Sequence, residues 1–304
     1  MPQAQTAICR ECGGYAVYLT LTVRQGGEAI AKKAAAALPA LTKTFADKLD
    51  LPALASALGV GASVWPRLFD IAAPRGLAAF SPISSGNRLA PATPADLFLH
   101  IHSPSHDANF QLARAAMELF GDSVQVVEEI HGFSHRGNRD LTGFVDGTEN
   151  PTGDDRAAVA LVGDDAPAFE GGSFVSIQRY VHDMRRWNAL PVPDQEAAVG
   201  RTKEANEELA DDIKPPSAHI ARVVIEENGE ELEVVRHSLP YGTTTEAGLY
   251  FVAYCASPAP FRKMLKRMVE DDADGHHDRL LDFTRAVTGA SFFSPSVEML
   301  ESLV

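Results

Sequence analysis

Hydrophobic and polar residues follow two kinds of spacing in the first half of the chain. Alternation of β-branched and aromatic residues with polar ones is typical of half-buried strands, and apolar residues three or four apart are typical of helices. Strands are therefore predicted over residues 15–23, 97–103 and 124–130. Helices are predicted over residues 28–50, with a disturbance at Pro39, and over residues 107–120. Residues 51–94, which mix Gly, Ser and Pro, should hold a short helix and an irregular strand.

The same order of elements recurs after a passage rich in Gly, Asp and Pro. Strands are predicted over residues 173–181, 222–225, 231–238 and 248–255. Helices are predicted from residue 183 onward, over residues 259–269 and around residues 278–285. The dipeptide Asn228-Gly229 between two strand-like runs predicts a hairpin, because both residues adopt the positive φ of a tight turn readily.

Two halves that each mix antiparallel strands with two helices predict an α+β fold. The expected architecture is a pair of ferredoxin-like domains of the duplicated, dimeric α+β barrel type. The order of elements carries this prediction, because the two halves show no clear sequence repeat. We expect an N-terminal domain over residues 1–137, a linking segment over residues 138–172 and a C-terminal domain over residues 173–304.

Composition narrows the class of protein. The 304 residues are 45% hydrophobic and 22% charged, as in ordinary globular proteins. A net charge of -14 argues against nucleic acid as a partner, because binding to phosphates needs a basic face. No stretch approaches the ~18 to 20 apolar residues of a membrane span, and the N-terminus does not look like a secretory leader. With only three cysteines, of which Cys9 and Cys12 form an incidental CxxC, we expect a cytoplasmic protein without membrane contact.

The segment RDLTGFVDGTENP at residues 139–151 is the first candidate for chemistry. Its glycines and its Asn-Pro step are turn formers, so by itself it is best explained as a loop between domains. In that interpretation Asp146 only supports an Asx turn. Phe144 and Val145 between the glycines weaken the interpretation slightly, since a fully solvated loop has little use for them.

His219 and Arg236 lie on the two arms of the predicted hairpin. A two-residue turn at Asn228-Gly229, extended along both arms, pairs Arg236 with Ala221 and His219 with Ser238. His219 and Arg236 would then be diagonal neighbours on one face, ~7 to 8 Å apart in an ideal ladder. Two prolines before His219 should peel the chain away and lengthen that separation. Both side chains are still expected at one end of the hairpin, within reach of one large cofactor.

Together these motifs resemble one enzyme family. The sequence GFVDGTENP contains the GxxDG signature of dye-decolourising peroxidases. The histidine before a hairpin, and the RxSxPYG segment that leads into GLYF, are similar to the type B, bacterial cytoplasmic branch. The similarity extends to GRTKE at residues 200–204 and AVTGASFFSPS at residues 286–296.

The resemblance implies one haem b per chain, held mainly by the C-terminal half. By position in the motifs, His219 matches the axial ligand of the haem iron, and Asp146 and Arg236 match the distal catalytic pair. Arg236 would also pair with a haem propionate. Ser238 stands where family members carry a small polar residue facing the distal pocket, so it counts with these three among the cofactor-binding residues.

A carboxylate behind the axial histidine is also expected from the resemblance. Asp278 is the candidate, and Asp282 is close enough in sequence to compete with it. A carboxylate that accepts a hydrogen bond from the second ring nitrogen gives the imidazole partial imidazolate character. Such a ligand stabilises the oxidised iron of a peroxidase.

The implied function is a haem peroxidase, an oxidoreductase that reduces hydrogen peroxide and oxidises bulky aromatic or dye-like electron donors. An acidic pH optimum is expected, because Asp146 remains a base where a histidine is already protonated. One alternative is a haem-binding or haem-trafficking protein with incidental peroxidase activity. Another is a protein of the same architecture that binds a different small molecule without haem. The resemblance further implies a homo-oligomer, and no C-terminal tag for packaging into a protein shell is visible.

The remaining histidines and acidic residues are expected to be structural. His100 and His102 alternate along one predicted strand, but no third ligand suggests a metal site. The acidic turn DDADGHHD at residues 271–278 does not have the spacing of a calcium-binding EF-hand loop, and we expect its histidines to be solvated.

Overall fold

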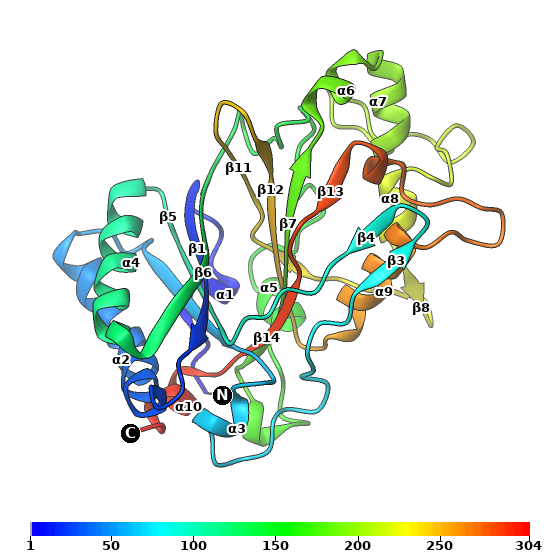
Figure 1. The fold of residues 1–304 in the computed structure, drawn as a ribbon. Coiled ribbons are helices and arrows are strands. Elements are labelled where there is room, and N and C mark those ends of the chain that lie inside the picture. The colour runs from blue at the N-terminus through cyan, green and yellow to red at the C-terminus, as the bar shows by residue number, and fades with distance from the viewer. Residues whose placement is uncertain (1) are drawn as a thin grey trace.

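The computed structural model describes residues 2–304, and its N-terminal half forms a four-stranded antiparallel sheet with two long helices on one face (Figure 1). The sheet has the order β2-β5-β1-β6, as in a ferredoxin-like unit. Its strands are β1 (Tyr15–Val23), β2 (Ala55–Val60), β5 (Leu97–Ser103) and β6 (Val124–Phe133). Its helices are α2 (Glu28–Lys48) and α4 (His106–Phe120). The strands and helices predicted for this half are confirmed, apart from small shifts at their ends.

Two details of this half differ from expectation. α2 continues through Pro39, where a disturbance was predicted. The missing backbone hydrogen bond costs ~3 kcal/mol, but Ala35 and Leu38 pack the same face of the helix into a large apolar core, which offsets it. Residues 51–94 hold the short helix α3 (Trp65–Leu68), the fully buried strand β2 and a hairpin of β3 (Ile83–Ser85) and β4 (Arg88–Ala90).

The C-terminal half repeats the sheet but replaces the long helices with short ones. Its strands are β7 (Ser173–His182), β10 (Val235–Arg236), β11 (Leu239–Gly242), β12 (Ala247–Cys255), β13 (Thr284–Ala286) and β14 (Ala290–Ser294). Its main helices are α6 (Met184–Ala189), α7 (Val192–Val199), α8 (His219–Val223) and α9 (Ala259–Val269). Strand β12 pairs with β10 and β11 on one side and with β7 on the other, and β7 pairs with β13 and β14. The halves therefore share one topology, and the predicted α+β fold with antiparallel sheets is confirmed.

The predicted hairpin is only partly confirmed. Asn228 and Gly229 form its turn, between β8 (Glu226–Glu227) and β9 (Glu230–Glu231). The strand predicted over residues 222–225 is wrong, because the chain there belongs mostly to α8, which packs against α9. The pairings of Arg236 with Ala221 and of His219 with Ser238 are wrong for the same reason.

Arg236 pairs instead with Ala253 of the neighbouring strand β12.

A second correction concerns the end of the chain, where the helix predicted around residues 278–285 is the short 3-10 turn η3 (Arg279–Asp282) followed by β13. Asp278 caps that turn by accepting a hydrogen bond from the backbone of Leu280, at 2.9 Å. Thr284, Arg285 and Ala286 then pair with β7, which ends the helical pattern.

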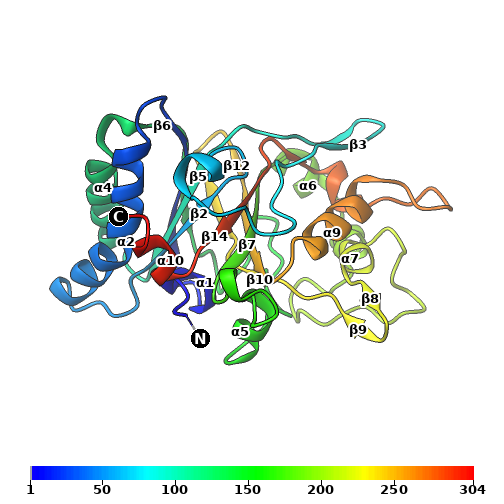
Figure 2. The same cartoon turned by 90° about the horizontal axis from the view of Figure 1, so that it is seen from below.

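The two sheets join through β14, which pairs with β2 at Phe293 and Val60. Figure 2 shows the halves side by side, with β14 between β2 and β7. Their inner faces share an apolar core rich in aromatic side chains, in which the rings of Tyr18 and Tyr250 stack with centroids 4.3 Å apart. The molecule thus has the interior of an α+β barrel.

The ends of the chain close this barrel. The short helices α1 (Thr6–Cys9), α5 (Asp155–Ala160) and α10 (Val297–Glu301) lie close together in Figure 2. Gln5 is buried, and its side-chain amide donates to the carbonyls of Leu58 (3.0 Å) and Pro295 (2.9 Å). Over residues 2–304 the three cysteines are free, and none of the helices has the length and apolarity needed to cross a membrane.

Candidate functional site

A large cavity opens between the sheet of the C-terminal half and its short helices. Its empty volume is about 1600 Å³, counting the open space at the mouth. Apolar side chains from α8, α9 and β12 form much of the wall: Ile220, Val223, Leu249, Phe251, Phe261, Met264, Leu265 and Met268. A wall this apolar and this long suits a flat, hydrophobic ligand with a few polar anchors.

The segment GFVDG forms part of the wall as a tight double turn. Gly143 and Gly147 have φ values of 93° and 79°, which favour glycine. The backbone amide of Asp146 donates to the carbonyl of Asn138 at 2.9 Å, which fixes the carboxyl-bearing residue. Phe144 is buried against Trp187, and this packing explains an apolar residue in a loop sequence. Asp146 lines the cavity, so the segment is more than a linker.

The segment at residues 200–204 holds this double turn from outside. Arg139 donates from Nη1 to the carbonyls of Gly143 (2.8 Å) and Lys203 (2.6 Å). A Cβ atom on Gly143 would lie 2.5 Å from Cε of Lys203, so a larger residue there would displace the end of that lysine side chain as well as strain the backbone. Two motifs that are distant in the sequence are thus one structural unit.

His219 begins α8 and contacts a carboxylate behind it. Its Nδ1 donates to Oδ2 of Asp278 at 2.6 Å, and the side chain of Asp278 is completely buried. Among the described residues, Nε2 of His219 has no hydrogen-bond partner, and the residue lines the cavity. Asp282, the competing candidate, lies instead 3.1 Å from Nε2 of His277. The imidazole therefore presents one free nitrogen to the cavity and anchors the other.

Asn150, at the end of the motif segment, fixes the position of Arg236. Its side-chain amide accepts from the backbone N–H of Arg236 at 2.8 Å and donates to the carbonyl of the same residue at 2.9 Å. Arg236 lines the cavity, and its Nε is buried without a partner among the described residues. A buried guanidinium nitrogen without a partner is costly, so it is a ready donor for an acidic group of a ligand.

Ser238 lies two residues further along the chain. Its hydroxyl accepts from the backbone amide of Val252 at 3.4 Å, and it is not among the residues that line the cavity.

The pKa values of two of the predicted residues are both raised, for different reasons. Burial raises the pKa of Asp146 above its ordinary value, and the guanidinium of Arg236 offsets part of this increase. Burial alone would lower the pKa of His219, but the carboxylate of Asp278 outweighs burial, so that pKa is raised. The structure therefore brings Asp146, His219 and Arg236 to one cavity, with Asp278 behind it.

A second histidine–carboxylate pair in the cavity wall escaped the sequence analysis. Nε2 of His182 lies 3.1 Å from Oδ1 of Asp140, and its Nδ1 lies 2.8 Å from the hydroxyl of Thr284. Burial raises the pKa of Asp140, but the contact with His182 outweighs burial and the pKa is lowered. The only sequence signal was the position of Asp140, six residues before Asp146 in the same segment. Both ring nitrogens of His182 are occupied, unlike those of His219.

The predicted strand histidines lie elsewhere, in the barrel interior. His100 and His102 are fully buried there together with His237, and their ring centroids are 5.1 to 5.5 Å apart. The contacts of this barrel histidine cluster are to Tyr254, to Arg156 and to backbone carbonyls. Among residues 2–304, no carboxylate pairs with any of the three.

Two family models together match nearly the whole chain. Residues 5–134 match the model described as Dyp-type peroxidase, N-terminal, and residues 137–299 match Dyp-type peroxidase, C-terminal. The chain is 42% identical to a dye-decolorizing peroxidase of Mycolicibacterium paratuberculosis, over 94% of this chain and 82% of that protein. It is 39% identical to a dye-decolorizing peroxidase of Rhodococcus erythropolis, over 94% of this chain and 85% of that protein.

Solved structures agree with the sequence comparisons. A putative Dyp-type peroxidase of Shewanella oneidensis superposes with a TM-score of 0.96 at 40% identity, covering 99% of both chains. DyPB of Rhodococcus jostii superposes with a TM-score of 0.95 at 38% identity, again over 99% of both chains. Variants of the R. jostii protein have been determined in complex with haem, and one in complex with manganese.

Proposed function

The chain belongs to the type B branch of the Dyp-type peroxidase family and is a haem peroxidase, and we propose how its cavity performs this reaction. The cavity would hold one haem b per chain, and Nε2 of His219 would bind its iron. The single observation that carries this assignment is the His219–Asp278 pair, whose free nitrogen faces an apolar cavity also lined by Asp146 and Arg236. Haem complexes of a related protein support the same cofactor.

The residues present fit such a cofactor. Apolar side chains of α8 and α9 would contact the macrocycle, and Nε of Arg236 would donate to a propionate or to peroxide. Asp278 holds the proton on Nδ1 of His219, which fixes the tautomer and turns Nε2 toward the cavity. Ser238 is assigned by its motif position to the rim of the distal pocket.

When bound, haem would supply the redox-active iron at which the O–O bond of peroxide is reduced. Asp146 would accept a proton from one oxygen of peroxide and return it to the oxygen that leaves, which lowers the barrier to bond breaking. Arg236 is a permanent cation beside the negative charge that develops during cleavage, and its position is fixed by Asn150. The proton transfer needs a carboxylate and the developing negative charge needs a cation, and Asp146 and Arg236 supply these two groups.

The pH dependence follows from the protonation of Asp146. A base works in its deprotonated form, so the rate of reaction with peroxide should rise with pH as the carboxyl ionises. The ordinary pKa of a carboxyl lies below that of a histidine; burial raises the pKa of Asp146 above its ordinary value, and the guanidinium of Arg236 opposes that rise. We therefore place the optimum on the acid side of neutrality, and a maximum at pH 8 or above would contradict Asp146 as the base.

Electron donors are assigned by size and charge. Bulky aromatic or dye-like molecules would reach the surface near the cavity rather than the iron itself. A net charge of -14 favours neutral or cationic donors over anionic ones at low ionic strength. We further propose a homo-oligomer that works in the cytoplasm, as the resemblance to the type B branch implies.

An absorption spectrum of the protein as purified tests the proposal most directly. We expect a Soret band, a haem b signature in the pyridine haemochrome assay and one haem per chain. One equivalent of peroxide should shift the band within the mixing time of a stopped-flow instrument. A haem-trafficking protein would show the band without the rapid shift, and that result would favour the alternative function. A protein that does not retain haem after reconstitution would contradict both.

A further inference from the structure

Two side chains of helix α8, His219 and Arg222, bind the segment between α9 and η3, residues 270–278. Only His219 is the proposed haem ligand. The first link is the hydrogen bond from His219 to Asp278. The second is an ion pair three residues further along the helix, where Nη1 of Arg222 donates to Oδ2 of Asp272 at 2.8 Å. Residues three apart share a helix face, so both links leave α8 on the same side.

Arg222 is bound at all three guanidinium nitrogens. Besides the bond to Asp272, its Nε donates to the carbonyl of Arg267 at 2.9 Å and its Nη2 to that of Glu270 at 3.3 Å. Only 6% of its side chain is exposed. Arg267, on α9, donates in turn to the carbonyls of Ala221 (2.8 Å) and Val224 (2.9 Å). These hydrogen bonds of Arg222 and Arg267 connect the ends of α8 and α9, and we call the two residues the arginine clasp.

Asp272 organises the chain between this clasp and Asp278. Its Oδ1 accepts from the backbone amides of Asp274 (3.0 Å) and His276 (2.9 Å), and its own amide donates to the carbonyl of His276 (2.9 Å). These bonds close a small loop. Immediately after the loop, the amide of Asp278 donates to the carbonyl of Met268 at 3.1 Å. The carboxylate of Asp272 therefore binds Arg222 of the arginine clasp and also stabilises the loop that comes directly before Asp278.

We propose that Arg222 and Asp272 are positioning residues that hold the carboxylate of Asp278 against Nδ1 of His219. The proposal rests on the proposed function, in which His219 binds the haem iron. Loss of the ion pair would let residues 272–278 shift and would lengthen the bond between Asp278 and His219. The imidazole would then be a weaker electron donor, with a weaker bond to iron and a more positive reduction potential.

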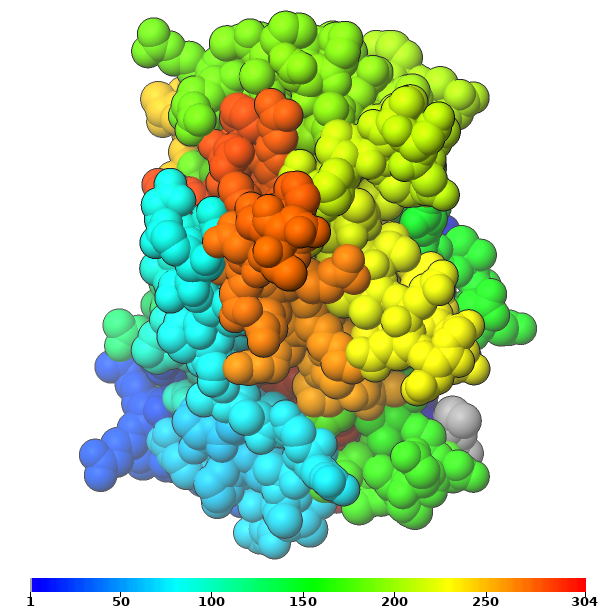
Figure 3. Space-filling view, turned by 90° about the vertical axis from the view of Figure 1, so that its right-hand side faces the viewer, coloured from blue at the N-terminus to red at the C-terminus, as the bar shows by residue number. Residues whose placement is uncertain are grey.

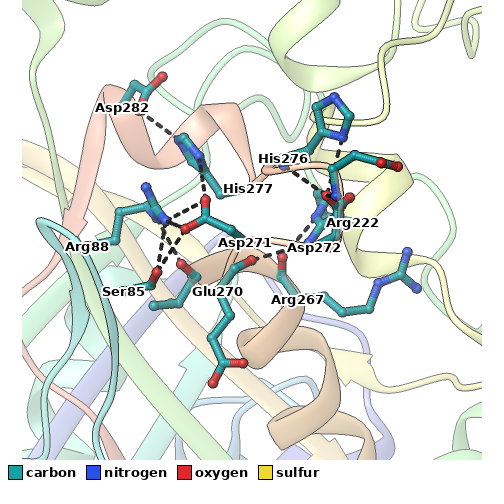
Figure 4. Close-up of polar contacts among 12 residues, drawn as sticks. Ser85, Arg88, Arg222, Arg267, Glu270, Asp271, Asp272, His276, His277 and Asp282 are labelled. Carbon is teal, nitrogen blue, oxygen red and sulfur yellow. Dashed lines mark hydrogen bonds and ion pairs between the residues drawn. The ribbon is translucent and has the colours of Figure 1, made fainter.

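The same loop offers a control on its other side. Figure 4 shows Asp271 and Asp272, neighbours in the chain, reaching toward different partners. Oδ1 and Oδ2 of Asp271 both accept from Nη2 of Arg88 at 2.8 Å, and this pair ties the loop to the β3–β4 hairpin. In Figure 3 the orange loop after α9 lies between the cyan hairpin and the yellow segment that contains α8. The Arg88–Asp271 pair has no contact with α8. Its removal therefore loosens the loop from the hairpin but leaves the bonds of the arginine clasp in place.

The experiment compares Asp272→Asn with Asp271→Asn in the haem-loaded enzyme. The two substitutions are chemically identical, lie side by side and each remove one ion pair with an arginine. Resonance Raman of the ferrous form gives the iron–histidine stretching frequency, and redox titration gives the midpoint potential. Transfer of haem to excess apomyoglobin gives a readout that does not depend on activity.

We expect Asp272→Asn to lower the stretching frequency, raise the potential and speed haem transfer about tenfold, the lower end of the effect of losing a group that orients a metal ligand. Asp271→Asn should match the wild type in all three measurements. Asp278→Asn should shift them in the same direction as Asp272→Asn and further. Wild-type values for Asp272→Asn, or equal shifts for both loop variants, would overturn the proposal.

Two further variants separate the ways of failing. If His219→Ala retains haem with an unchanged spectrum, the ligand assignment fails, and the positioning proposal fails with it for that separate reason. If Asp272→Asn does not fold, Arg222→Lys against Arg88→Lys carries the same comparison. Lysine keeps the charge but not the fork that reaches Glu270 and Arg267, so the expected shifts are smaller and have the same sign. No shift in Arg222→Lys would then overturn the proposal.

Discussion

The molecule buries histidines in two regions, and the two regions treat them in opposite ways. In the barrel interior, His100, His102 and His237 contact one another, a tyrosine and backbone carbonyls. Burial dominates there and lowers the pKa of each, so all three are neutral. In the cavity, Asp278 lies behind His219 and raises its pKa despite burial. The carboxylate of Asp278 is thus the feature that would make His219 a strong metal ligand, and burial by itself does not supply this.

The largest expected effect comes from removing a histidine in each region. His219→Ala should lose haem, with affinity falling by more than the ~100-fold that loss of a supporting residue can cost. His102→Gln, in the barrel histidine cluster, should retain haem at one equivalent per chain. Haem content after gel filtration measures both. Equal retention in the two variants would break the comparison, because His219 would then be one more structural histidine.

The second effect concerns Asp146, which lines the same cavity as His219. Asp146→Asn removes the proposed base but keeps the size of the side chain. We expect the second-order rate with peroxide to fall by ~10²- to 10⁴-fold, the usual contribution of a positioned acid–base group, with the Soret band retained. Stopped-flow mixing at pH 5 measures the rate. The variant should also lose the rise of rate with pH that ionisation of Asp146 gives the wild type, and a persistent rise would assign the base elsewhere.

The third effect concerns the barrel histidine cluster, where burial lowers the pKa of His102 to about 4. The unfolded chain binds a proton near pH ~6.5 and the folded chain does not, so stability is complete above ~6.5 and is lost as the pH falls toward 4. The loss due to this residue should reach about 2 kcal/mol at pH 4.5. Urea unfolding at pH 7 and pH 4.5 should show a smaller difference in His102→Gln than in the wild type. Identical differences would mean that this residue does not control acid stability.

The smallest effect tests how the cavity keeps a charged group in place without an ion pair. Asn150→Ala removes both bonds to the backbone of Arg236 but leaves the guanidinium itself. The rate with peroxide should fall about tenfold, because a displaced cation stabilises developing charge less well. Asn206→Ala, which removes a side-chain contact with Thr148 in the same part of the chain, is the control and should react at the wild-type rate. A normal rate in Asn150→Ala would show that β10 alone positions Arg236.

The sequence predicted best the elements whose residue types repeat with a clear period. The bounds of β1, β5 and α9 agree with the predicted ranges because their hydrophobic patterns end where the elements end. Strand β2 was missed as a regular strand because its sequence, ASALGV, consists mostly of small residues and has few of the β-branched and aromatic residues typical of strands. α8 was misassigned because its residues favour strands locally, while its helical form depends on contacts with α9 that are distant in sequence.

The residues of the candidate site also divide into those that the sequence predicted and those that it did not. Asp146, His219 and Arg236 were predicted from motifs and share the cavity, although the hairpin register invoked to bring the latter two together was wrong. The bonds from Asn150 to Arg236 span 86 positions, and those from Arg222 to Asp272 span 50. Such partners follow from the packing of one half against itself. No spacing in the sequence marks them, which is why they appear only in three dimensions.

Strand β14 has a consequence for how the chain folds during synthesis. It is the last strand of the sequence, yet among residues 2–304 it alone forms a strand pair between the two halves, at Phe293 and Val60. Gln5 adds a bond from the start of the chain to Pro295. A nascent chain therefore exposes the unpaired edge of β2 on the ribosome until nearly every residue has emerged. Closure between such distant residues is slow, and the waiting edge is a site where a second nascent copy can pair.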